Sequence, residues 1–109
     1  MDLYHTTDTD GVTELNPSAE IMRELLDSLD NTGAGEAEHP DVSLVHDTSG
    51  WSISVFPSGV VTFENLDEPD EMPRYMIKVS RNEALKFWID LSHGRIEHLR
   101  SQPWLREEA

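Results

Sequence analysis

The chain has 109 residues, a length that fits one domain with a single hydrophobic core. Lys and Arg total 8 and Asp and Glu total 22, so the formal net charge is −14. This charge argues against a nucleic-acid or anionic-membrane binder, because phosphate contacts require clustered Lys and Arg. The absence of cysteine excludes disulfides, thiolate nucleophiles, iron–sulfur clusters and Cys-type zinc sites.

The charge is divided unevenly along the chain. Residues 1–73 contain 17 carboxylates and a single base, Arg23, whereas residues 74–109 contain five carboxylates and seven bases. Such a division predicts two electrostatically different faces, or an acidic surface opposite a neutral one. No apolar run approaches the ~18 residues of a membrane span, and the first residues lack the basic start and apolar stretch of a signal peptide. We therefore expect a soluble, cytoplasmic protein.

The N-terminal part of the chain predicts an irregular segment followed by a helix. Residues 1–15 show no sustained hydrophobic period, so we expect them to be a flexible segment ahead of a single α+β domain at residues 16–109. Asn16 can cap the helix, and Pro17 suits its first position. The helix is predicted to end near Asp30, with an apolar stripe made of Ile21, Met22, Leu25, Leu26 and Leu29.

The middle of the chain predicts four strands, because apolar and polar residues alternate there. The expected strands cover residues 42–46, 51–55, 60–63 and 74–79. The second and third are joined by Pro57-Ser58-Gly59, which predicts a hairpin. The fourth is expected to place Tyr75, Ile77 and Val79 on one face.

A second helix is predicted after the strands. Ser80 and Glu83 have the spacing of a capping box, and an apolar face follows that includes Leu85 and Trp88. Gly94 is a natural end or kink, and Pro103 stops the helical period before Trp104. The predicted fold is therefore α+β, a four-stranded antiparallel meander flanked by an N-terminal and a C-terminal helix in the order αββββα. Its expected core includes Leu25, Ile53, Phe63, Leu85 and Trp88.

The histidines and short acidic motifs give little support for a metal site. His93 and His98 are five positions apart, which places them about 140° apart around a helix rather than on one face. Asp8 and Asp10 precede a glycine as in a calcium loop, but the loop positions that require carboxylates would be Thr6 and Pro17. No metal ion and no cofactor is predicted.

Catalytic motifs are equally weak. Asp47-Thr48-Ser49-Gly50 has Ser where an aspartic protease has its glycine, and a hairpin turn explains the same four residues. We expect no catalytic residue and a protein that is not an enzyme. The alternative is a small enzyme or ligand-binding domain that uses His46 or His93 with a nearby carboxylate, between the sheet and the helices.

The acidic segment 64–71 contains five carboxylates in eight residues: Glu64, Asp67, Glu68, Asp70 and Glu71. Such a run is either a solvated loop or a recognition surface for a basic partner. Trp104 also has two interpretations. It either folds back to cover the core or serves as an exposed anchor for a partner.

The order of motifs over residues 42–105 resembles small acidic immunity proteins of bacterial polymorphic toxin systems. The motifs are Gly50-Trp51, Pro57-Ser58-Gly59-Val60-Val61, Val79-Ser80-Arg81-Asn82-Glu83-Ala84, Phe87-Trp88, Gly94 and Pro103-Trp104. The resemblance implies a non-enzymatic inhibitor that binds and blocks a toxin domain, such as a nuclease or a deaminase. Together with the charge, it predicts a protein-binding module whose acidic surface blocks a basic site on a protein partner.

Overall fold

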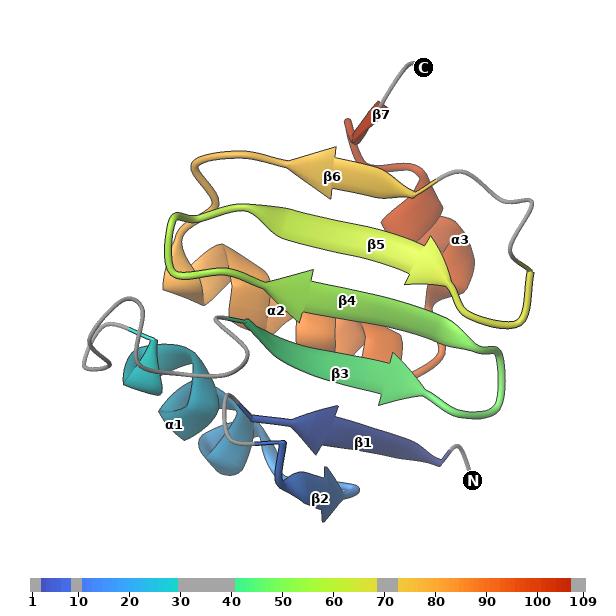
Figure 1. Ribbon diagram of the computed structural model, residues 1–109. Helices are drawn as coiled ribbons and strands as arrows, with labels where there is room; N and C mark the ends of the chain where they lie inside the picture. Colours follow the sequence, from blue (N-terminus) through green and yellow to red (C-terminus); the bar gives the residue numbers. More distant parts are fainter. Residues whose placement is uncertain (1–2, 9–10, 30–40, 69–72, 107–109) are drawn as a thin grey trace.

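The computed structural model describes residues 3–8, 11–29, 41–68 and 73–106 of the 109-residue chain. Its elements are β1 (Tyr4–Thr7), β2 (Thr13–Leu15), α1 (Ala19–Ser28), β3 (Val42–His46), β4 (Trp51–Val55), β5 (Val61–Asn65), β6 (Arg74–Met76), α2 (Arg81–Ser92), α3 (Ile96–Arg100) and β7 (Leu105–Arg106). The strands form one antiparallel sheet of seven strands in the order β2-β1-β3-β4-β5-β6-β7. The three helices lie behind this sheet in Figure 1.

The predicted α+β class and antiparallel sheet are confirmed, whereas the predicted order αββββα is wrong. The central meander β3–β6 forms as expected, with Leu44 opposite Ile53 and Ile53 opposite Phe63. Strands β1, β2 and β7 extend the meander at both edges, so the sheet has seven strands where four were expected. The helices pack on the same side of the sheet, and α2 contacts both α1 and the central strands.

The N-terminal segment contributes an interior strand, which corrects the expectation that residues 1–15 lack regular structure. β1 pairs with β3 on one side and with β2 on the other. Thr6 points toward the helices and is fully buried. Asn16 secures the end of this hairpin because its backbone N–H donates to Tyr4 O at 2.8 Å and its Oδ1 accepts from Tyr4 N at 3.0 Å. Asn16 therefore does not cap α1.

Both long helices begin at a serine. The hydroxyl of Ser18 accepts from Ile21 N at 3.3 Å, so the cap lies two residues after the predicted one. At α2 the predicted capping residue is correct, because Ser80 Oγ accepts from Glu83 N at 3.1 Å. Such side-chain caps satisfy amide groups that have no partner within the helix.

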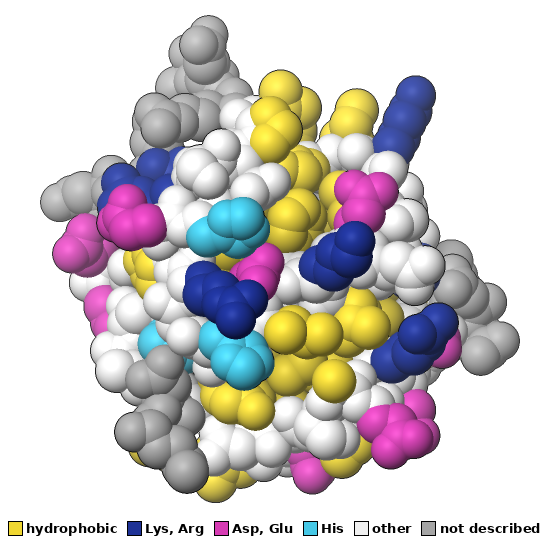
Figure 2. Space-filling view, turned by 180° about the vertical axis from the view of Figure 1, so that it is seen from behind, with side chains coloured by type: hydrophobic (Ala, Val, Ile, Leu, Met, Phe, Trp, Pro, Cys, Tyr) yellow, Lys and Arg dark blue, Asp and Glu magenta, His cyan; other side chains and the backbone are white. Residues whose placement is uncertain are grey.

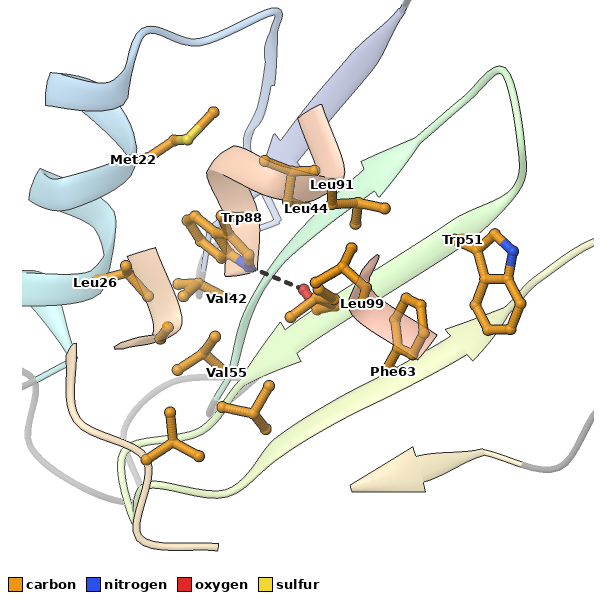
Figure 3. Close-up of a cluster of buried hydrophobic side chains, with 14 of the residues drawn as sticks. Met22, Leu26, Val42, Leu44, Trp51, Val55, Phe63, Trp88, Leu91 and Leu99 are labelled. Carbon is orange, nitrogen blue, oxygen red and sulfur yellow. Dashed lines mark hydrogen bonds between the residues drawn. The ribbon is translucent and has the colours of Figure 1, made fainter. Parts of the chain in front are cut away.

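The core fills the space between the sheet and the helices (Figure 3). Ile53, Phe63 and Trp88 of the predicted core are fully buried, and Leu25 and Leu85 pack against them with partial exposure. The Trp88 indole N–H donates to the main-chain oxygen of Ile53 at 3.1 Å, which is the dashed line in Figure 3. This bond fixes α2 over the centre of the sheet.

β6 differs from its prediction in length and in orientation. It ends at Met76, because Lys78 takes a left-handed conformation with φ 55°. Arg74 is the buried residue of this strand, and its guanidinium lies 5.7 Å from the centroid of the Trp51 ring. Tyr75 and Ile77 point the other way, and Ile77 is 53% exposed.

The side of the sheet that faces the viewer in Figure 1 is not covered by any helix of the described chain, and we call it the open face. The register assigns to this face a set of mainly hydroxyl-bearing residues. They are His5, Thr7, Thr13, Leu15, Ser43, Val45, Ser52, Ser54, Thr62, Glu64, Tyr75 and Leu105. Among the residues of these strands whose side chains the structure describes, no Lys or Arg occupies an outward position.

Candidate functional site

Four carboxylates gather at one end of the sheet, and we call this group the acidic end: Asp47, Glu64, Asp67 and Glu68. The register places them together, because β3 finishes at His46, opposite Trp51, and Trp51 lies opposite Asn65 near the end of β5. Asp47 directly follows β3, and Asp67 and Glu68 directly follow β5. Glu64 points outward from β5 on the open face.

The turn that carries Asp67 and Glu68 is held by Asn65. Its Oδ1 accepts from Asp67 N at 2.9 Å and from Glu68 N at 3.2 Å, as in an Asx turn. Its Nδ2 donates to Ser49 O at 3.4 Å, which ties this turn to the neighbouring β3–β4 turn. Each of these bonds restricts the chain that positions the carboxylates.

Gly50 allows the two turns to approach closely. It has φ +79°, a left-handed conformation that favours glycine, and its carbonyl accepts from Leu66 N at 2.8 Å. A side chain at this position would overlap the carboxylate of Asp67. The acidic end is therefore a packed arrangement of two turns and not an isolated loop.

One carboxylate of the acidic end contacts a histidine ring, and the other three have no Lys or Arg partner in the described chain. His5 Nδ1 lies 2.9 Å from Asp47 Oδ2, with Asp47 39% exposed. Glu64, Asp67 and Glu68 form no ion pair with any Lys or Arg in the described ranges. Asp67 and Glu68 are exposed and Glu64 is half-buried. These oxygens are available to a guanidinium or ammonium group from another molecule.

The structure brings together three of the predicted partner-binding residues, Glu64, Asp67 and Glu68. Asp70 and Glu71 lie outside the described residues. Sequence reasoning missed Asp47 as a member of the site, although one signal was present. If residues 51–55 and 61–65 form a hairpin, residue 51 faces residue 65, and the turns on either side must then meet.

Trp104 packs against the core of the protein. Its ring stacks on Phe63 with the centroids 5.2 Å apart and contacts Phe87 at 5.4 Å. Its indole N–H donates to Leu99 O at 2.6 Å, and the side chain is half-buried. Phe63 stacks in turn on Trp51, with the centroids 4.4 Å apart. This placement fits the interpretation of Trp104 as a residue that covers the core.

The two histidines of the alternative hypothesis lie on different elements. His46, at the end of β3, is buried, and its Nδ1 lies 2.7 Å from Ser49 Oγ. His93 is exposed and forms the C-cap of α2. Among the described residues, no group of three or more His, Asp or Glu side chains could hold a metal ion.

The helix-covered side has a mixed surface, in contrast to the open face. Figure 2 shows Lys and Arg, Asp and Glu, His and hydrophobic side chains interspersed on it. Asp90 is an example, because Arg95 Nη1 lies 3.0 Å from one of its oxygens and His98 Nε2 lies 3.6 Å from the other. Asp90 on this side is paired with Arg95, whereas Glu64, Asp67 and Glu68 have no cationic partner in the described chain.

Comparison of the chain with protein-family models, with curated proteins and with solved structures finds no match. None of the helices in the described ranges is long and apolar enough to cross a membrane. The geometry of the acidic end is therefore the basis for the functional proposal below.

Proposed function

We propose that this chain is a non-enzymatic protein-binding module that uses the acidic end to occupy a basic site on a partner protein. The observation that carries the proposal is the cluster of Glu64, Asp67 and Glu68, which a packed pair of turns holds without cationic partners in the described chain. Carboxylates that are already held in position lose little conformational entropy on binding, so more of their electrostatic attraction contributes to affinity.

The whole-chain charge supports this role. A net charge of −14 attracts a positively charged protein from a distance, and among the described side chains of the strands no Lys or Arg points outward on the open face to oppose it. Complementary charge raises the association rate and makes it dependent on salt. Because the sequence resembles immunity proteins, the first partner to test is a toxin domain with a basic catalytic cleft, a nuclease or a deaminase.

The test uses a site variant and a control variant of equal net charge. The site variant is Glu64→Gln, Asp67→Asn and Glu68→Gln, and the control is Glu20→Gln, Glu24→Gln and Glu97→Gln on the helix-covered side. Wild type and both variants are immobilised, and proteins captured from the native extract are quantified by mass spectrometry. The protein whose captured amount falls most between wild type and the site variant is purified for kinetic measurements.

We expect the site variant to associate with that partner roughly 3–10 times more slowly at low ionic strength. The difference should shrink at high salt, because exposed charges are screened over about 10 Å at 0.1 M. The control should associate at nearly the wild-type rate. If no protein binds wild type more strongly than the site variant, or if both variants slow association equally, then local recognition by the acidic end is disproved.

A further inference from the structure

The open face carries an apolar groove beside the acidic end. The groove has a volume of about 280 Å³ and lies at the edge of the sheet formed by β5, β6 and the residues that flank them. It is lined by Val60, Thr62, Pro73, Arg74, Tyr75 and Ile77. Arg74 contributes no free cation here, since its guanidinium lies over the Trp51 ring.

Exposed apolar side chains lie in and beside the groove. Tyr75 lies between Thr62 and Leu105 in the sheet register. Leu105 is 46% exposed and Ile77 is 53% exposed. Large apolar side chains that are exposed next to one another, with a groove between them, are typical of interaction sites.

The groove and the acidic end are continuous along β5. Thr62 lines the groove, and Glu64 is the next outward residue of the same strand. Two residues along a strand span roughly 7 Å, which is within reach of adjacent side chains of one bound segment. A single segment of a partner can therefore contact both regions.

We propose that the groove receives an aromatic or branched aliphatic side chain of the partner, and that Lys or Arg residues flanking that side chain contact the acidic end. This inference rests on the proposed function and adds the apolar part of the recognition. The adjacent carboxylates select a basic segment. They disfavour a second copy of this chain, because two faces with unbalanced negative charge would repel one another.

The test uses two peptides of equal charge, acetyl-Lys-Arg-Phe-Arg-Lys-amide and acetyl-Lys-Arg-Gly-Arg-Lys-amide. Each is titrated into the full chain while backbone amide shifts are followed by NMR. Both peptides should shift the amides of Glu64, Asp67 and Glu68. Only the Phe peptide should also shift those of Tyr75 and Ile77, and it should bind about fivefold more tightly.

Two variants separate the groove from the rest of the sheet. Tyr75→Ala should remove the preference for the Phe peptide and keep the shifts at the acidic end. Leu15→Ala changes a residue that is 65% exposed at the opposite edge of the sheet, and it should keep the preference. Far-UV circular dichroism of each variant establishes that the sheet is intact.

Different outcomes refute the groove inference and the proposed function. If the Phe and Gly peptides bind equally and shift only the acidic end, the groove inference is overturned and the proposed function stands. If neither peptide shifts the acidic end, the proposed function loses its support, and with it the basic occupant of the groove. If sedimentation shows a dimer that Tyr75→Ala dissociates, the occupant is a second copy and the inference is overturned.

Discussion

Replacing Gly50 with alanine tests whether the two turns of the acidic end are in direct contact. The left-handed backbone at this position costs an L-residue about 1–2 kcal/mol. The added Cβ would also displace the Asp67 carboxylate. We expect this displacement to break the hydrogen bond from Asp67 N to Asn65, which costs about 0.5–1.5 kcal/mol of stability. We therefore expect Gly50→Ala to lower the free energy of unfolding by about 2–3 kcal/mol.

Gly59→Ala is the matched control. Gly59 has φ +91°, but a Cβ there meets its nearest atoms at an ordinary 3.5 Å, so only the backbone cost of about 1–2 kcal/mol applies. Urea unfolding followed by far-UV circular dichroism measures both variants. Gly50→Ala is expected to lose more stability than Gly59→Ala. Adding Asp67→Ala to the Gly50→Ala protein should restore this additional loss. If Gly50→Ala costs no more than Gly59→Ala and Asp67→Ala does not rescue it, the two turns are not packed together.

Three further changes test the fold by the same urea unfolding measurement. Thr6→Val should raise the free energy of unfolding by about 1 kcal/mol, because the buried Thr6 hydroxyl has no hydrogen-bond partner in the described chain. A lower stability would contradict the inward placement of β1. Trp88→Ala should cost about 3–5 kcal/mol, since it removes a fully buried ring and its bond to Ile53, and an unchanged midpoint would disprove the packing of α2 on the sheet. Ser80→Ala should cost about 1 kcal/mol by removing the cap of α2, whereas Ser80→Asp should retain most of the stability. Equal losses in both would show that the cap is not the cause.

The elements that the sequence predicted well are those with strong local patterns. Alternation at 42–46 and 51–55 reflects strands with one buried face, and all the inward residues there are buried. The spacing of Ser80 and Glu83 marks the start of α2. In each case the side chains that determine the element are neighbours in sequence, so the pattern is visible without the tertiary structure.

The elements that the sequence missed depend on distant contacts. β1 contains only one fully buried side chain, Thr6, and its place in the sheet depends on pairing with β3. In β6, Arg74 occupies an inward position because its charge lies over the ring of Trp51. The hydrophobic pattern of this strand instead predicts that Tyr75 and Ile77 point inward. The run at 64–71 indicated an acidic site, but only the strand register shows that Asp47 belongs to it.

The interior position of β1 also has a consequence for the order in which the sheet assembles. The chain that must close to pair Thr7 with Ser43 is roughly six times longer than the chain that pairs Val55 with Val61, which adds about 1.6 kcal/mol of closure entropy. The meander can therefore form its local pairs early, and β1 joins at the end of folding. Interactions made late change the unfolding rate more than the folding rate. The N-terminal strand should thus set how long the folded molecule persists, while the meander sets how fast it forms.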